Sequence, residues 1–244
     1  MTRSVPPPSD AMPQLDLSVL LQGQVLDWLL AGMRLSLMLT LLALVIALPL
    51  GALIALARLA PFPPLRALAW TYVEAVRNVP LLAHMLFWYF AVPELLPDEV
   101  KAWLYAGNVE AAAALAALVV YTAAFMAEDV RSGLRSVPPG QWEAAKAMGL
   151  QFSGSVRWVV LPQALRATVP PLISQTLNLW KNTSIATVVG AAELMYQAQR
   201  VESATFRGFE TFAMATATYL GVSMLITGAG VLYQRRYPVR PAGH

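Results

Sequence analysis

Cysteine is absent from the 244-residue sequence, and histidine occurs only twice, at His84 and His244. The absence of cysteine excludes disulfide bonds, thiol chemistry and cysteine-ligated metals, and two histidines alone cannot build a histidine-based metal site. Charged residues are also scarce, at 13% of the chain, compared with about 25% in an ordinary soluble domain. The sequence contains no Gly-x-x-x-x-Gly-Lys-Ser/Thr phosphate loop, so the chain itself is not expected to hydrolyse ATP.

Hydrophobic residues make up 57% of the chain, and the mean hydropathy is +0.55. Several apolar runs are too long for the strands of a membrane barrel, so the composition predicts a helical membrane protein with one domain. We predict an all-α membrane protein with five transmembrane helices, in a transmembrane domain at 28–236. The expected spans are 35–57, 67–92, 111–131, 170–189 and 211–234.

The two ends of the chain are more polar than the expected spans. Residues 1–27 are Pro-rich and lack the basic start, apolar core and cleavage site of a signal peptide. We interpret them as an extracytoplasmic tail, and residues 237–244 as a cytoplasmic tail.

The distribution of basic residues predicts the orientation. Ten Lys and Arg residues lie in the first connection, at the end of the third span, in the loop 136–166 that follows it and near the C-terminus, whereas five lie on the opposite side. Since cytoplasmic segments carry the excess of basic residues, we expect the loop and the C-terminus in the cytoplasm and the N-terminus outside. The ten are Arg58, Arg66, Arg131, Arg135, Lys146, Arg157, Arg166, Arg235, Arg236 and Arg240, and the five are Arg3, Arg34, Lys101, Arg200 and Arg207.

Ionisable residues inside the expected second span suggest a functional role, because a charge within a membrane is costly. Glu74, Arg77 and His84 lie there, and Pro80 leaves the carbonyl of Val76 without its helical donor. Arg77 could face a polar path or form an interior ion pair with Glu74. His84 is more typical of a packing residue than of a ligand.

The expected fourth span has a polar middle. Its amides and hydroxyls can orient a carboxylate or an ammonium group, or they can form hydrogen bonds between helices. The lysine could line a path or extend towards an interface. The residues are Asn178, Lys181, Asn182, Thr183 and Ser184.

The loop 136–166, between the third and fourth spans, is too polar to cross a membrane. Pro138 and Pro139 end the preceding helix, and good helix formers follow as far as Met148. Gly149 is expected to end this short helix as its C-terminal glycine. The loop could form two short helices that dock on a partner, or an amphipathic segment on the bilayer surface.

This loop resembles the EAA loop of the permease subunits of ABC importers. The match comprises a Glu-Ala-Ala triplet, a glycine four residues later, and a closing apolar-x-Leu-Pro sequence in which valine replaces the usual isoleucine. By this resemblance, the ATPase-coupling residues are Glu143, Ala144, Ala145, Gly149, Leu161 and Pro162.

Three further motifs resemble the polar amino-acid permeases of these importers, and the resemblance covers roughly residues 28–236. They are RNVPLL at 77–82, AEDVRSG at 127–133 and KNTSIA at 181–186. With FWYF at 87–90 and PELLP at 93–97, the chain looks most like glutamate/aspartate permeases. Asp129 stands where an apolar residue is usual, and we expect little effect of it on substrate choice. The residues expected along the substrate path are Arg77, Asn78, Asn178, Lys181, Asn182, Thr183 and Ser184.

The resemblance implies a complex in the bacterial inner membrane. Two permease subunits, identical or paired, would form the path, and two cytosolic ABC ATPases would dock on their loops and use the ATP. A periplasmic solute-binding protein would deliver the amino acid. The chain is expected to be surrounded by membrane lipid and to bind no cofactor, metal or nucleic acid.

The charge of the fourth span favours an acidic amino acid as the substrate. Many relatives that carry neutral or cationic amino acids have Lys-Asp where this chain has Lys181 and Asn182, so the membrane midplane is less negative here. Pro80 would also free a carbonyl for the substrate's ammonium group. A broader set of polar amino acids is an alternative.

Two other functional classes are less well supported. An intramembrane enzyme needs a nucleophile and a base, for which only Ser184 and His84 qualify. An ion channel needs a filter of carbonyls or a ring of charges, and neither is evident. A neighbouring ATPase, binding protein and second permease in the genome would favour the importer.

Overall fold

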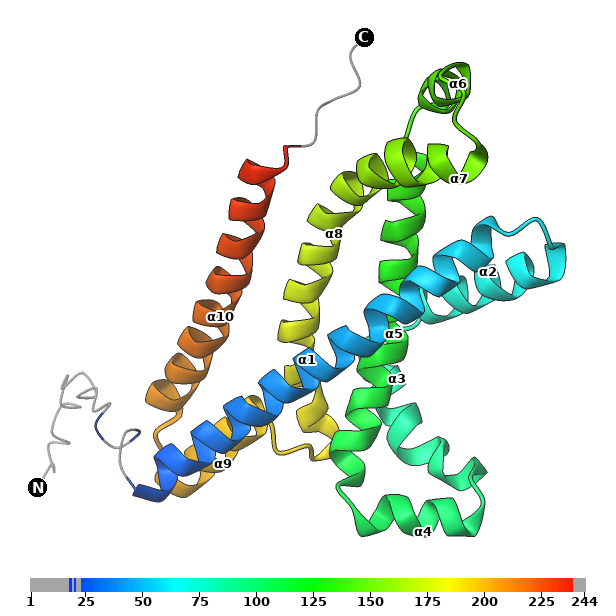
Figure 1. Cartoon of the computed structure of the whole chain (residues 1–244). Coiled ribbons are helices and arrows are strands. Elements are labelled where there is room, and N and C mark those ends of the chain that lie inside the picture. The colour runs from blue at the N-terminus through cyan, green and yellow to red at the C-terminus, as the bar shows by residue number, and fades with distance from the viewer. Residues whose placement is uncertain (1–17, 19, 21–22, 239–244) are drawn as a thin grey trace, which may run out of the picture.

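The structure is a computed structural model that describes residues 18, 20 and 23–238. Within these residues all regular structure is helical (Figure 1), as the all-α prediction requires. Most of the predicted N-terminal tail, 1–27, and of the predicted C-terminal tail, 237–244, lies outside the described residues. Helix α1 already begins at Gly23.

Three helices in the described part of the chain are long and apolar enough to cross a membrane. They are α1 (Gly23–Leu59), α5 (Val109–Arg135) and α10 (Gly208–Arg236), and they match the first, third and fifth predicted spans. With 37 residues, α1 is about 55 Å long, well over the ~30 Å of a hydrocarbon core. Such a helix fits a bilayer when it is strongly tilted, and α1 crosses α5 obliquely in Figure 1.

The predicted second span, 67–92, is wrong as a single helix. Helix α2 (Pro63–Arg77) ends before Pro80, and the chain restarts as α3 (Leu81–Leu86), which continues into the π-helical turn η2 (Phe87–Ala91). Pro80 has no amide hydrogen, and its ring disfavours helical backbone at the preceding residue, so the helix breaks there. The connection to α5 consists of η3 (Pro93–Leu95) and α4 (Asp98–Ala106).

The predicted fourth span, 170–189, also consists of two pieces. Helix α8 (Leu161–Asn182) begins well before residue 170, with Pro162 in its first turn, where a missing amide hydrogen does no harm. The chain then tightens into the 3₁₀ helix η5 (Thr183–Val189), which ends at Gly190 with a φ of 84°.

Small residues bring α1 and α5 into close contact at the centre of the molecule. Ala43 and Ala47 of α1 and Ala117 and Ala123 of α5 are fully buried. A Cβ atom on Gly51 would lie 2.9 Å from the carbonyl oxygen of Ala123. Close backbone approach of this kind is a common basis of helix association in membranes. Helix α5 also packs against α8, so these two helices can enclose a site.

A buried carboxylate joins α9 (Leu194–Thr205) to α1 and α10. Glu193 caps α9 by accepting hydrogen bonds from the backbone N–H groups of Met195 and Tyr196, at 3.0 and 2.9 Å. Hydroxyl groups of Ser36 on α1 and Tyr219 on α10 donate to the same carboxylate, at 3.2 and 2.9 Å. Burial raises the pKa of Glu193 above the ordinary glutamate value, despite these donors.

The connections between the long helices lie at opposite ends of the molecule (Figure 1). At one end lie α6 (Pro139–Ala147), α7 (Phe152–Ser155) and the π-helical turn η4 (Val156–Val160), with the C-terminal ends of α5 and α10. Helices α4 and α9 and the start of α1 lie at the other end. This separation agrees with the predicted placement of the loop and the C-terminus on one side.

Candidate functional site

The predicted coupling loop forms a short helix with a defined end. Helix α6 carries Glu143 and Ala144 on its exposed surface and Ala145 in a buried position. At its end the N–H of Gly149 bonds the carbonyl of Lys146 at 2.9 Å, and the N–H of Leu150 bonds that of Ala145 at 3.1 Å. Gly149 has a φ of 80°. This pair of bonds around a left-handed residue is the Schellman motif, so the prediction that Gly149 ends the helix is confirmed.

The loop presents apolar side chains that the chain itself does not cover. Trp142 stacks on Phe152, with ring centroids 5.8 Å apart and planes 19° from parallel. Phe152 and Trp158 are nonetheless largely exposed. A pocket of about 510 Å³ beside α6 is bordered by Glu143 and Lys146 and by the stacked rings of Trp142 and Phe152. An exposed apolar surface rimmed by charges is typical of a protein-binding site.

The last two residues predicted for coupling, Leu161 and Pro162, lie in the first turn of α8. They follow η4 and therefore connect the loop to the helix that lines the candidate path. A movement of the loop can reach that helix through this turn.

A polar pocket of about 270 Å³ lies between α5 and α8. Asn178 and Asn182, both predicted along the substrate path, line it together with Gln175, and their spacing places all three on one face of α8. Helix α5 contributes Thr122 and two aromatic rings. The seven lining residues are uncharged: Tyr121, Thr122, Phe125, Gln175, Asn178, Leu179 and Asn182.

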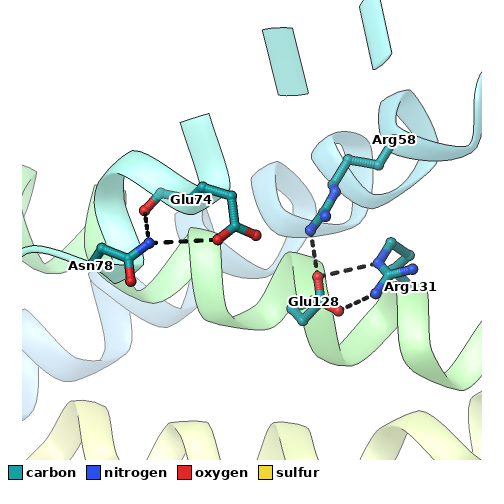
Figure 2. A network of polar contacts seen from close by, with 5 residues as sticks. All are labelled: Arg58, Glu74, Asn78, Glu128 and Arg131. Carbon is teal, nitrogen blue, oxygen red and sulfur yellow. Dashed lines mark hydrogen bonds and ion pairs between the residues drawn. The ribbon is translucent and has the colours of Figure 1, made fainter. Parts of the chain in front are cut away.

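Arg77 lies beside this pocket but does not line it. Its guanidinium group lies over the Phe125 ring, 5.1 Å from the centroid, in a cation–π arrangement. Among the described residues Arg77 forms no ion pair with Glu74. Figure 2 shows instead that Asn78 turns towards Glu74, and its side-chain nitrogen donates to the Glu74 carbonyl at 2.7 Å. Asn78 is therefore held at the end of α2, outside the pocket.

The carbonyl of Val76 is not free for a substrate, contrary to the sequence-based expectation. Pro80 does remove its helical donor, but Nε2 of His84 lies 3.1 Å from this oxygen and replaces that donor. The His84 ring also packs edge-on against Tyr121, with centroids 5.8 Å apart. His84 thus acts as the packing residue expected for it and holds α3 against the end of α2.

Three residues predicted along the path are not brought into the pocket. Thr183 is fully buried, and its hydroxyl donates to the carbonyl of Trp180 in its own helix at 2.8 Å. The Ser184 hydroxyl donates to the carbonyl of Lys181, also at 2.8 Å. Lys181 is exposed and does not border the pocket. Since Ser184 and His84 bond to different carbonyl groups, they do not form the nucleophile–base pair of an enzyme.

Sequence reasoning missed two residues that bear on the pocket. Gln175 precedes Asn178 by three residues and Asn182 by seven, a helical spacing that could have identified it. Asp129 lies on α5 one turn after Phe125, and its carboxylate interacts with the side chain of Gln175 and with the charge of Arg77. One of its oxygens, Oδ2, is buried without a hydrogen-bond partner. Asp129 therefore lies closer to the pocket than its position near the end of the span suggests.

Comparisons with known proteins agree with this arrangement. The chain matches the family described as "Binding-protein-dependent transport system inner membrane component" over residues 47–237. It is 34% identical over 215 residues to the glutamate/aspartate import permease protein GltJ of Escherichia coli (strain K12), covering 86% of this chain and 87% of that protein. It is 41% identical over 203 residues to the probable glutamine ABC transporter permease protein GlnM of Bacillus subtilis (strain 168), covering 80% and 89%.

A solved structure has the same fold. A chain from the crystal structure of an amino acid ABC transporter with histidines superposes with a TM-score of 0.80 at 28% identity, covering 92% of this chain and all of that chain. The similarity therefore extends over the broken second and fourth segments as well as the three long helices.

Proposed function

The chain belongs to the family of binding-protein-dependent transport system inner membrane components, as the permease subunit of an ABC amino-acid importer, and we propose that its substrates are glutamate and aspartate. The observation that carries this proposal is the pocket between α5 and α8, whose lining residues include no carboxylate. An acidic side chain meets no like charge on that lining, and the guanidinium of Arg77 lies just behind Phe125.

The polar groups of the pocket suit a carboxylate. The amides of Asn178 and Asn182 can each donate two hydrogen bonds, while the side chain of Gln175 is shared with the carboxylate of Asp129, and Thr122 lines the pocket from α5. Hydrogen bonds to a charged group contribute about 1.5–3 kcal/mol each. The similarity to GltJ, a glutamate/aspartate import permease protein, supports the same substrate.

Glutamine is the second candidate. The same amides can also pair with an amide side chain, because each offers an acceptor as well as donors. Lys181 and Arg77, which we expected to balance an acidic substrate, do not line the pocket. The likeness to GlnM, a probable glutamine permease, points the same way.

We propose five membrane crossings, with the broken segments α2–η2 and α8–η5 as the second and fourth. The N-terminus then faces outside, and the loop around α6 faces the cytoplasm. Membership of the family implies an ATPase and a binding protein as partners. In the proposed complex, two ATPases dock on the α6 loops of two permease subunits and use the ATP, while this chain binds no cofactor.

Asn182→Asp tests the substrate assignment, because it places a carboxylate on the lining without changing the side-chain shape. ATP-driven uptake of glutamate and of glutamine is measured in reconstituted vesicles, with the binding protein saturated. We expect the glutamate-to-glutamine uptake ratio to fall at least about tenfold, since two like charges in a poorly solvated site repel by more than 1.4 kcal/mol.

Gln163→Glu is the matched control, because it makes the same amide-to-carboxylate change at the far end of α8, where Gln163 contacts Gln141 at 3.1 Å. Its uptake ratio should stay that of the wild type. An unchanged ratio in Asn182→Asp would contradict the pocket as the substrate site. Transport of glutamine without glutamate by the wild type would replace the first candidate with the second.

A further inference from the structure

Four arginines meet in a second pocket, at the junction of α1, α2 and α5. Its volume is about 480 Å³, and it is separate from the residues that line the polar pocket. The arginines come from the last turn of α1, the first turns of α2 and the last turns of α5. They are Arg58, Arg66, Arg131 and Arg135.

Only part of this positive charge is balanced within the described part of the chain. Figure 2 shows that Arg58 and Arg131 converge on the carboxylate of Glu128 from α1 and α5. The side chains of Arg66 and Arg135 form no hydrogen bond or ion pair among the described residues, and both are exposed. The pocket therefore presents two free guanidinium groups beside a pair that Glu128 holds in place.

The pocket also has an apolar side. Trp70, whose surface is 54% exposed, and Leu59 line it next to the arginines. Leu56 and Leu53 continue the outer surface of α1 at helical spacing, and they are 56% and 64% exposed. The arginine cluster is therefore next to an exposed apolar track on α1, which is formed by Leu59, Leu56 and Leu53 and is about two helical turns long.

The pocket lies at the ends of α1 and α5, two of the helices that are long and apolar enough to cross a membrane, where lipid headgroups are expected. All four arginines lie in the end turns of helices, where the chain leaves the apolar region, and α1 is the most apolar of the candidate spans. Tryptophan and arginine are both common at the membrane–water interface, because each side chain combines an apolar part with a polar end.

We propose that this pocket binds the phosphate of an anionic phospholipid, with one acyl chain along Leu56 and Leu53. Guanidinium groups bind phosphate oxygens through paired, charge-assisted hydrogen bonds, and Arg66 and Arg135 are the donors available for them. Basic pockets between membrane helices are a known setting for anionic headgroups. The apolar track distinguishes a lipid from a free phosphate ion, which would use the arginines alone.

Lipid binding to the purified full-length chain tests this proposal. Native mass spectrometry from detergent measures the binding of phosphatidylglycerol and of phosphatidylcholine with identical acyl chains. Glycerol phosphate, the soluble headgroup, is added as a competitor in a separate arm. The variant Arg66→Gln/Arg135→Gln removes only the unpaired arginines, so the ion pairs of Glu128 and the fold should remain.

The control Arg235→Gln/Arg236→Gln removes two arginines from the last turn of α10, another helix end on the same side of the molecule. We expect the wild type and the control to bind phosphatidylglycerol about tenfold more tightly than phosphatidylcholine. We expect Arg66→Gln/Arg135→Gln to lose at least about tenfold in phosphatidylglycerol binding, and glycerol phosphate to compete weakly.

Three results would overturn the proposal. The first is equal binding of the two lipids by the wild type. The second is that glycerol phosphate competes as strongly as intact phosphatidylglycerol, which would assign the site to a free phosphate. The third is unchanged phosphatidylglycerol binding in Arg66→Gln/Arg135→Gln, which would show that these two arginines do not hold the lipid. Because none of these readouts depends on transport, they are independent of the proposed substrate.

Discussion

Gly149 offers a quantitative test of how the coupling loop is built. Its φ of 80° lies in the left-handed region, and no atom lies within 4 Å of the position that a Cβ would occupy. The effect of Gly149→Ala should therefore come from the backbone alone, at about 1–2 kcal/mol. A destabilisation of that size increases the population of alternative loop conformations about 5- to 30-fold.

A series of variants separates backbone strain from steric obstruction. Gly149→Asn should be milder than Gly149→Ala, because asparagine tolerates left-handed backbone. Gly149→Leu adds a bulky side chain to an exposed surface and should impair docking further. Gly140→Ala is the control, because Gly140 lies in α6 with equally open surroundings, and alanine there favours the helix by up to about 1 kcal/mol.

The assays are co-purification with the partner ATPase and ATP-driven uptake in proteoliposomes. We expect activity to decrease in the order wild type and Gly140→Ala, then Gly149→Asn, Gly149→Ala and Gly149→Leu, with normal membrane insertion throughout. Wild-type association and uptake in both Gly149→Ala and Gly149→Leu would refute the coupling role. Equal damage by Gly140→Ala would show that the loop tolerates no change at all, rather than requiring a left-handed glycine.

Other predictions concern topology, charge and pH. A cysteine introduced as Ser153→Cys should react with a membrane-impermeant thiol reagent only after permeabilisation, and labelling of intact cells would reverse the proposed orientation. Lys181→Met should leave the glutamate-to-glutamine uptake ratio at the wild-type value, because Lys181 does not line the pocket, whereas a loss of glutamate uptake by about tenfold would place its ammonium group on the substrate path. Burial raises the pKa of Glu193, so the folded protein holds this proton more tightly than the unfolded chain does. Its contribution to stability is then largest at low pH and declines as pH rises from the ordinary glutamate range through the raised pKa. Glu193→Gln should therefore make Tm fall less steeply as pH rises, and the same dependence of Tm on pH in this variant and in the wild type would contradict a role of Glu193.

The sequence predicts the membrane class and the three long helices because each depends on a local property. An apolar run of sufficient length must form a helix in a bilayer, since its backbone has no other hydrogen-bond partners. The end of α6 is local as well, because a glycine after a run of helix formers is enough to indicate the C-terminal turn.

The broken segments depend on contacts that hydropathy does not reveal. The mean hydropathy of residues 67–92 is high enough to conceal the break at Pro80. The new helix that begins at Leu81 is supported by the contact of His84 with the Val76 carbonyl. The pocket is non-local too. Gln175 and Thr122 become neighbours only because α5 packs against α8. Thr183 looks suitable for substrate by residue type, but its hydroxyl is used within its own helix.

Uptake by the complete reconstituted complex shows directly whether this chain belongs to a glutamate and aspartate importer. The permease, its ATPase and its binding protein are assembled in vesicles, and ATP-driven entry of labelled glutamate, aspartate, glutamine, histidine and leucine is measured with the binding protein saturated. We predict uptake of glutamate and aspartate, competition between the two, and little entry of histidine or leucine. Entry of glutamine without glutamate or aspartate, failure of every amino acid to enter, or entry that does not depend on ATP would contradict this prediction.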